Sequence, residues 1–340
     1  MPEQQQAPGL AKVVEQVMAA LERRAQIEVV PLIPKDTGSL LMWRARQLPA
    51  AVRKQKLFGI HSFTSAFPFF GPGRRVQTIH ELPWRHGVRE NAGTKHRTWA
   101  RLGPLFADRV ATGTEFVARE LRSYSPLARN KISVCPWGVG EEFADEPPAG
   151  TIDEALLGHY RLPEDPLVLC LGAVRMKKNL AGVLRAVAEV KKRGGPRLHV
   201  VISGHETQNL RRDLGLAAKL GLSANISTLD TIEPEHLPGM YRLASVVPVL
   251  SHSEGFGLVT LEALASGTPV VVPKDSAQAE VAGEYAITVD PHDDLAVADG
   301  LMQAVKDREA LRYTLAERAK SYSWDRSAQS IEDIWQAMAK

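Results

Sequence analysis

Apolar and polar residues alternate along the chain with two periods, one typical of helices and one typical of buried strands. Residues 10–21 place apolar side chains at helical spacing and predict the first helix. Short apolar runs then predict strands in the first half: IEVVPL (27–32), LFGIH (57–61), RVQTIH (75–80), RVAT (109–112) and KISVCP (131–136). Strands that alternate with amphipathic helices predict an α/β fold with parallel sheets.

The second half of the chain repeats this alternation. Its apolar runs predict five more strands: LVLCLG (167–172), LHVVISG (198–204), ASVVPVL (244–250), TPVVVP (268–273) and YAITV (285–289). Between them, helices are expected to begin near Asn179, Gln208, Glu233 and Leu258. Each half therefore predicts a doubly wound domain of its own.

An acidic stretch rich in proline and glycine, EEFADEPPAG (141–150), is the linker candidate. We therefore expect an N-terminal domain over 1–150, a second domain over 151–325 and a terminal helix over 326–340 that crosses back to the N-terminal domain. Two doubly wound domains that face one another hold ligands in the cleft at the carboxyl ends of their strands.

The composition predicts a globular chain with a large core, since 44% of its 340 residues are hydrophobic and 24% are charged. No apolar run is long enough to cross a membrane, and the polar start MPEQQQAPG lacks the pattern of a signal peptide, which predicts a cytoplasmic protein. Cys135 and Cys170 lie inside apolar runs. We expect two buried thiols and no metal site.

The charge differs between the two halves. Residues 1–150 carry 21 Lys and Arg against 14 Asp and Glu, a net charge of +7, whereas the whole chain carries only +3. A basic half favours phosphates or an anionic surface as its partner. Nucleic acid is not expected, because the basic residues are scattered and no zinc-finger spacing or RNA-binding aromatic motif accompanies them.

The stretch SEGFGLVTLEALASGTPVV (253–271) combines two carboxylates with a glycine turn. A helix that begins at Leu258 would direct its first amides at an anion, and Gly255 and Gly257 would let the backbone approach closely. Glu262 lies one turn into that helix and could accept hydrogen bonds from sugar hydroxyls, as acidic groups do for ribose. With Glu254 in the turn, the stretch predicts a nucleotide-sugar site.

An isolated pair of glutamates could instead be a first-turn residue that complements the helix dipole and a solvated face residue. The whole stretch, however, resembles the donor-site signature of retaining glycosyltransferases of family 4, whose GT-B fold has two facing Rossmann-like domains. The resemblance implies a catalytic role for Glu254. It also implies these donor-binding residues: Arg175, Lys178, Gly255, Phe256, Gly257, Leu258, Val259 and Glu262.

The stretch LVLCLGAVRMKKNLAGVLRAV (167–187) resembles the opening of the family's second domain, and Lys178 matches the family lysine. An ammonium there offsets the charge that grows on the leaving diphosphate, so no metal is needed. Ala173 stands where the family has an arginine, and Arg175 or Lys177 would substitute for it. By itself, Lys178 could also be a solvated residue at a helix start.

The stretch VQTIHELPW (76–84) resembles the first-domain strand that ends in the family's catalytic-site histidine, here His80. An imidazole there could hydrogen-bond the transferred sugar or the acceptor. A lone histidine is more often structural. Only MPEQQQAPG precedes the first helix, so the family's first strand is missing and Gly9 would be the remnant of its glycine-rich loop.

The resemblance implies an enzyme that moves a hexose from a nucleotide diphosphate sugar to an alcohol acceptor with retention of configuration. MKKNL (176–180) is closest to subfamilies that use mannose donors, so GDP-mannose is the first guess and a UDP-hexose the second, with no cofactor and no metal. A nucleotide-sugar-binding protein without turnover, and another GT-B enzyme such as an epimerase, remain alternatives.

The acceptor is expected to be a glycan or a lipid-linked glycan. The segment LLMWRARQLPAAVRKQKLF (40–58) mixes apolar and basic residues, and this face is expected to approach an anionic membrane on its inner side. An ordinary helix that packs through its apolar side and exposes a basic face fits the same pattern equally well.

Overall fold

The computed structural model describes residues 8–34, 39–90, 92–144, 153–172 and 175–340. The chain forms two compact units. The first unit combines the chain up to Gly138 with Tyr322–Lys340, and the second unit spans Val139–Ser321.

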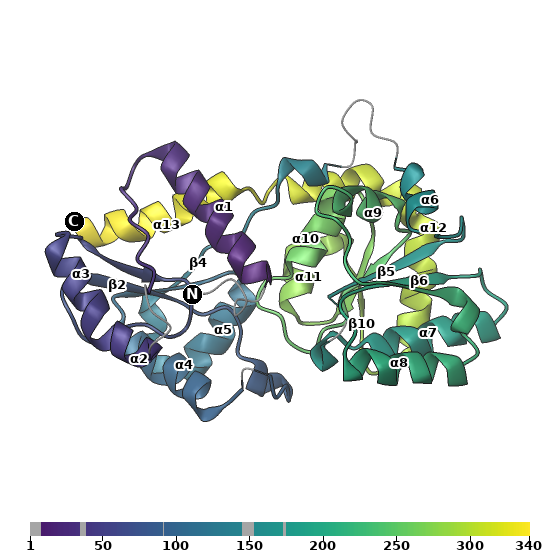
Figure 1. Ribbon diagram of the computed structural model, residues 1–340, viewed down its shortest axis with the longest axis horizontal. Helices are drawn as coiled ribbons and strands as arrows, with labels where there is room; N and C mark the ends of the chain where they lie inside the picture. The colour runs from purple at the N-terminus through teal and green to yellow at the C-terminus, as the bar shows by residue number, and fades with distance from the viewer. Residues whose placement is uncertain (1–7, 35–38, 91, 145–152, 173–174) are drawn as a thin grey trace. The chain divides into compact units, whose positions relative to one another are not determined.

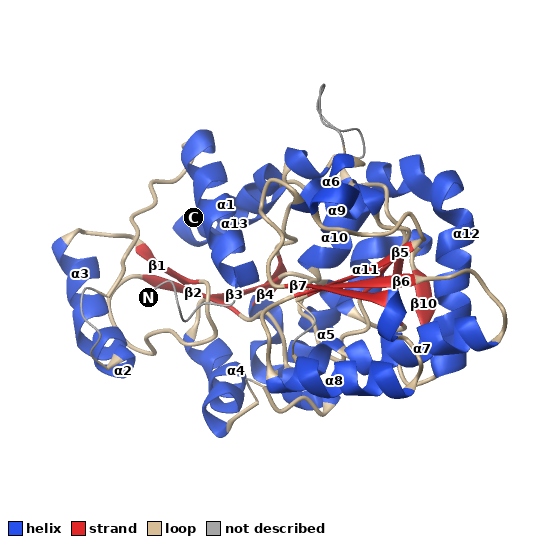
Figure 2. Ribbon diagram, turned by 45° about the vertical axis from the view of Figure 1, so that its right-hand side comes forward, coloured by secondary structure: helices blue, strands red, loops and turns tan. Residues whose placement is uncertain are grey.

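The sheet of the first unit contains four parallel strands in the order β1-β2-β3-β4, which are all labelled in Figure 2. They are β1 (Gly59–Ser62), β2 (Arg74–Thr78), β3 (Arg109–Thr112) and β4 (Ile132–Val134). In the register, Val76 pairs with Arg109 and Val110 pairs with Ile132. The predicted strand over 27–32 was wrong, because this segment adopts no strand structure despite its apolar residues. No strand occurs before Gly59 among the residues described.

The helices of the first unit cover both faces of this sheet (Figures 1 and 2). The helical segments are α1 (Pro8–Arg24), α2 (Leu40–Met42), the π-helix η2 (Trp43–Gln47), α3 (Leu48–Lys54), η3 (Pro83–His86), α4 (Thr94–Phe106), α5 (Glu115–Tyr124), η4 (Pro126–Lys131) and α13 (Trp324–Ala339). Helix α5 begins where the Thr114 side chain accepts a hydrogen bond from the Val117 amide, as expected of a helix cap.

Helices α1 and α13 pack side by side although they lie at opposite ends of the sequence. The guanidinium of Arg24 donates to Glu332 over 3.0 Å, and Glu332 is fully buried. On β1, a methyl group at Gly59 would lie 2.7 Å from the Trp335 ring, so only glycine lets α13 approach this closely. The C-terminal helix is therefore an integral part of the first unit.

The second unit contains six parallel strands: β5 (Leu167–Leu171), β6 (His199–Ser203), β7 (Ile226–Leu229), β8 (Val247–Pro248), β9 (Val270–Pro273) and β10 (Ile287–Val289). They form two three-stranded ladders, and a parallel bridge between Val168 and Val246 joins β5 to β8. The resulting order is β7-β6-β5-β8-β9-β10. Strand order reverses between β5 and β8, which is the doubly wound arrangement expected. Strand β7 was not predicted, because its residues ISTL are only partly buried and half of them are polar.

The helical segments of the second unit flank this sheet. They are η5 (Glu141–Phe143), α6 (Ala155–His159), η6 (Met176–Lys178), α7 (Leu180–Lys192), α8 (Gln208–Lys219), η7 (Ser223–Asn225), α9 (Leu237–Leu243), α10 (Leu258–Ala265), α11 (Ala277–Ala282), η8 (Gly283–Tyr285) and α12 (Asp294–Ala319). The helix expected near Glu233 begins only at Leu237, where Pro238 in the first turn supplies the helical backbone angle.

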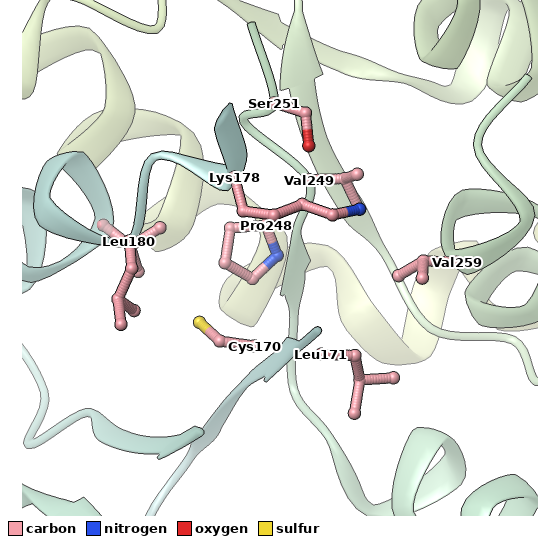
Figure 3. Close-up of a pocket in the computed structure, with 9 residues that line it drawn as sticks. Cys170, Leu171, Lys178, Leu180, Pro248, Val249, Ser251 and Val259 are labelled. Carbon is pink, nitrogen blue, oxygen red and sulfur yellow. The ribbon is translucent and has the colours of Figure 1, made fainter. Parts of the chain in front are cut away.

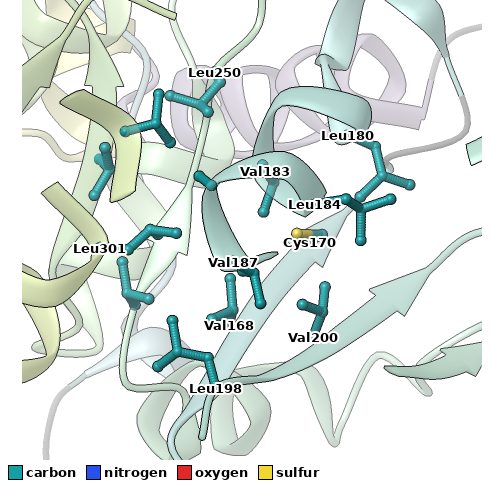
Figure 4. Packing of buried hydrophobic residues seen from close by; sticks show 14 of the residues in the cluster. Val168, Cys170, Leu180, Val183, Leu184, Val187, Leu198, Val200, Leu250 and Leu301 are labelled. Carbon is teal, nitrogen blue, oxygen red and sulfur yellow. The ribbon is translucent and has the colours of Figure 1, made fainter. Parts of the chain in front are cut away.

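Side chains from β5, β6, α7 and α12 form the main core of the second unit (Figure 4). Cys170 is part of this core, and Cys135 is buried in the first unit. Burial raises the pKa of each thiol to about 12, so both stay protonated. The prediction of two buried thiols is confirmed. Within the part of the chain that the structure describes, every helix is too short or too polar to form a membrane span.

Candidate functional site

A pocket opens in the second unit where the strand order reverses (Figure 3). Ligands of doubly wound sheets bind at this switch point, outside the carboxyl ends of the strands. The walls come from the ends of β5 and β8 and from the helices that follow them. The pocket is lined by Cys170, Leu171, Lys178, Leu180, Val183, Pro248, Val249, Ser251 and Val259.

The loop after β5 presents Lys178 to this pocket. Lys178 ends the single turn η6, and Asn179 follows in the left-handed conformation with φ of 55°. Asparagine tolerates this conformation, and its side chain caps α7 by accepting a hydrogen bond from the Gly182 amide. The same side chain donates to the Pro291 carbonyl over 3.0 Å, which ties this loop to the segment that follows β10.

Lys178 and Glu254 form an ion pair, with Nζ 2.7 Å from Oε1. The two side chains are 20% and 15% exposed. Burial opposes ionisation of Glu254, but the positive charges of Lys178 and Lys177 outweigh it and lower the pKa of the carboxyl. The carboxylate is therefore charged at neutral pH. The structure brings together the predicted diphosphate-binding cation and the predicted sugar-binding carboxylate.

Ser251 is a pocket residue that sequence reasoning missed. Its hydroxyl is buried, and Figure 3 shows it directed toward the Lys178 side chain. A hydrogen bond with Ser251 also helps to lower the pKa of the Glu254 carboxyl. The signal available in the sequence was its position, because Ser251 is the first polar residue after the apolar run of 244–250.

The predicted glycine turn leads into α10 as expected. Gly257 has φ of +92°, and a methyl group there would lie 3.1 Å from Gln278 Cγ, so the position requires glycine. Phe256 is buried and anchors the turn, while Gly255 is partly exposed. The first intrahelical bond runs from the Leu261 amide to the Gly257 carbonyl. The amides that precede it belong to the N-terminal turn of α10, where a helix favours an anion.

Leu258 and Val259 open α10, and Val259 lines the pocket. One turn later, Glu262 is only 7% exposed, so it is not a solvated face residue. Tyr241 on α9 donates its hydroxyl proton to Glu262 Oε2 over 2.8 Å. Burial, followed by the Glu262 charge, raises the pKa of Tyr241 well above its usual value. Glu262 is not among the residues that line the pocket.

Two histidines stack beside the lysine loop and were also missed. The rings of His252 and His292 lie 5.0 Å apart and are inclined by 10°. The His252 amide donates to the Lys177 carbonyl over 2.9 Å. Burial and the neighbouring His292 lower the pKa of His252, so this ring is neutral at pH 7. Arg175 lies in the same loop with an exposed side chain, whereas Ala173 lies outside the described residues.

His80 lies in the first unit, two residues beyond β2. Its Nε2 donates to the Phe63 carbonyl over 2.9 Å, and burial lowers its pKa despite this bond. His61, at the end of β1, hydrogen-bonds Thr78 over 2.9 Å, and burial and the nearby His80 lower its pKa to about 3. Both rings are therefore neutral. The sequence predicted His80 and missed His61.

Comparison with known proteins identifies the type of domain that carries the pocket. Residues 158–322 match the family described as Glycosyl transferases group 1. The D-inositol 3-phosphate glycosyltransferase of Nocardia farcinica is 32% identical over 241 residues, which are 68% of this chain and 53% of that protein. The chain spans about half the length of the relatives it matches.

Solved structures extend the similarity to both units. Sucrose-phosphate synthase from Thermosynechococcus elongatus superposes with a TM-score of 0.73 at 22% identity, over 92% of this chain and 82% of that one. Anabaena HepE in complex with UDP and glucose gives a TM-score of 0.72 at 16% identity, over 94% and 89% of the two chains. These likenesses confirm the predicted fold class. The chain therefore has the GT-B fold, and its residues 158–322 are similar to the glycosyl transferases group 1.

Proposed function

We propose that the protein is a retaining glycosyltransferase that moves a hexose from a nucleotide diphosphate sugar to an alcohol acceptor. The observation that carries this proposal is the Lys178–Glu254 ion pair at the switch point of the second unit, where Lys178 and Ser251 line a pocket. A cation and a hydroxyl in one pocket, with a carboxylate paired to the cation, suit the diphosphate and the hydroxyls of such a donor.

The ion pair suggests how donor binding proceeds. The Lys178 ammonium donates a hydrogen bond of 2.7 Å to Glu254 Oε1. An incoming diphosphate carries more negative charge than one carboxylate, so it takes Lys178 over and frees Glu254 for the hydroxyls of the sugar. When the glycosidic bond breaks, Lys178 and the first amides of α10 stabilise the charge on the leaving diphosphate without a metal.

For the donor, a UDP-hexose and GDP-mannose are the two candidates. The complex of HepE with UDP and glucose supports the first, and the MKKNL motif supports the second. The proposal is tested by incubating the protein with a panel of nucleotide sugars and measuring nucleotide release with and without acceptors. Release that requires an acceptor supports transfer. Release without an acceptor supports the epimerase alternative, and binding without release supports a protein that only binds nucleotide sugars.

The acceptor is proposed to be an alcohol that carries a phosphate. The matched relatives are named for D-inositol 3-phosphate, and a lipid-linked glycan also carries phosphate. In the first unit, a cavity of about 250 Å³ is lined in part by Trp84, Arg89 and Arg97. The Trp84 Nε1 is buried without a partner among the described residues, and the Arg97 guanidinium lies over the Trp84 ring. Two guanidinium groups beside a free indole donor suit a phosphorylated acceptor.

Contact of the first unit with an anionic membrane is proposed from segment 40–58. Leu48 and Val52 of this segment are buried and hold it to the unit, whereas Leu41, Met42 and Phe58 are 62%, 46% and 53% exposed. These exposed apolar side chains share the segment with five basic residues, the composition of an interfacial anchor. Co-sedimentation with neutral and anionic liposomes at low salt tests this contact, and equal binding to both contradicts it.

A further inference from the structure

A cluster of metal-ligating side chains lies outside the pocket, in the second unit. His159 ends α6, and Glu233 and His236 directly precede α9. One candidate ligand atom from each of the three residues can be chosen so that all lie within 4.8 Å of one another. None of the three lines the pocket that contains Lys178. We propose that these three residues bind one Zn²⁺ ion.

Two distances within the cluster are near those of such a site. His236 Nδ1 lies 3.2 Å from Glu233 Oε2, and His159 Nε2 lies 4.0 Å from Glu233 Oε1. In a tetrahedral zinc site with bonds of about 2.0–2.1 Å, ligand atoms lie about 3.3 Å apart. The contact between His236 and Glu233 already has this spacing. The contact between His159 and Glu233 needs a rotation of the half-exposed His159 ring. Two imidazoles and one carboxylate favour Zn²⁺ over Mg²⁺ or Ca²⁺, which prefer oxygen ligands.

Tyr160 holds the cluster in place before any ion binds. Its hydroxyl donates to Glu233 Oε2, and the Glu233 amide donates back to the same hydroxyl over 3.3 Å. A phenol that orients a ligating carboxylate is the kind of outer support that metal sites use.

The backbone on both sides of the cluster is also fixed. Arg242 on α9 pairs with Asp153, which lies just before α6, over 2.6 Å. A methyl group at Gly239 on α9 would lie 2.6 Å from Leu156 Cδ1 on α6, so the two helices are in close contact. The ion would therefore connect α6 to α9 at a second point. Because the ligands are 51%, 48% and 29% exposed, the ion can enter directly from solvent.

Zinc titration of the full chain by calorimetry tests the proposal. One Zn²⁺ per chain is expected, with a rise in unfolding temperature that EDTA reverses. Glu233→Gln and His159→Ala should each weaken Zn²⁺ binding at least about tenfold, and Tyr160→Phe about tenfold. Glu233→Gln retains an oxygen acceptor for Tyr160, so circular dichroism should show an unchanged fold. Co²⁺ in place of Zn²⁺ should give visible absorption that Glu233→Gln removes.

His205→Ala is the matched control, because His205 is another exposed histidine of the same unit beside a carboxylate, Asp230, at 2.7 Å. Its Zn²⁺ affinity should equal that of the parent. The proposal is overturned if the parent shows no saturable binding, or if His205→Ala loses as much affinity as Glu233→Gln. Binding that survives Glu233→Gln and disappears in His292→Ala would assign the ion to the stacked histidines instead.

Discussion

The pocket of the second unit and the histidine pair of the first unit both lie at strand ends, but they differ in charge. Lys178 lines the pocket and forms an ion pair of 2.7 Å with Glu254, and both side chains are partly exposed. In the first unit, His61 and His80 are kept neutral by burial, and each is bound to a scaffold oxygen. One site presents charge, and the other presents only neutral hydrogen-bonding groups.

This difference suggests that the two units bind different groups of the reacting molecules. A diphosphate needs compensating charge, which the second unit supplies in a form that can exchange partners. Neutral imidazoles cannot compensate the charge of a diphosphate. They can accept hydrogen bonds from hydroxyl groups or donate hydrogen bonds to them, and they do not attract anions. Variants that remove a charge should therefore have large effects in the second unit, and pH should act mainly on the first.

The largest effect is expected from Lys178→Ala. This variant removes a charge-assisted contact to the diphosphate and leaves the Glu254 carboxylate without its ion-pair partner, so nucleotide-sugar affinity should fall at least about 100-fold. Calorimetry with the donor identified in the panel measures this loss. Lys219→Ala, which removes an exposed lysine at the end of α8, is the control and should bind like the parent.

The double variant Lys178→Ala/Glu254→Gln separates the two contributions. If the unpaired carboxylate repels the donor, removing it should restore part of the affinity lost in Lys178→Ala. If Lys178→Ala and the double variant bind the nucleotide sugar equally tightly, the ion pair has no role in donor binding.

The next largest effect is expected from Glu262→Ala. Loss of a charge-assisted hydrogen bond to the ribose costs roughly 1.5–3 kcal/mol, so nucleoside diphosphate and nucleotide sugar should both bind about 10- to 150-fold more weakly. The Tyr241 hydroxyl also loses its acceptor, which should lower the free energy of unfolding by about 1–3 kcal/mol.

Glu262→Gln and Glu284→Ala serve as comparisons for this variant. Glu262→Gln keeps an acceptor for Tyr241 and should recover stability but not full affinity, whereas Glu284→Ala removes an exposed glutamate and should match the parent. If Glu262→Ala loses stability and keeps its nucleotide affinity, Glu262 only supports the packing of α9 on α10.

The smallest effect is the pH dependence of stability from His61. Its folded pKa of about 3 lies below the ordinary 6.5, so the unfolded chain binds a proton that the folded chain does not. Stability is therefore lost as pH falls below 6.5, by at most about 2 kcal/mol at pH 5. Denaturant unfolding of the parent and of His61→Gln measures this, and the variant should lose less stability between pH 7 and pH 5. Equal losses would contradict the burial of a neutral His61.

The sequence predicted the features of the donor pocket that depend on contiguous residues. The glycine turn follows from Gly257, whose left-handed angle suits only glycine, and the start of α7 follows from Asn179 as a cap. The reversal of strand order could be expected because strands and helices alternate regularly in the second half. These features are fixed by local backbone preferences, which a single sequence displays.

Pairings between distant residues could not be predicted in the same way. Lys178 and Glu254 are 76 positions apart, and no local preference reveals that their side chains meet. Segment 27–32 has the composition of a strand but forms none, because a strand also requires a partner. His61 was overlooked since only the fold places it next to His80. The roles of His80, Glu254 and the other site residues remain predictions.

The most direct test of the proposed function is Glu254→Gln, which separates donor binding from sugar transfer. If Glu254 yields Lys178 to the diphosphate and then holds the sugar, the variant should bind nucleoside diphosphate as tightly as the parent, or up to about fivefold more tightly. Transfer should fall about 10- to 150-fold, because the lost contact strengthens in the transition state. On the same preparation, calorimetry measures the affinity for the nucleoside diphosphate and a transfer assay measures the rate of transfer. Unchanged transfer, or nucleotide affinity that falls as far as in Glu262→Ala, would contradict the proposed exchange of Lys178 between Glu254 and the donor.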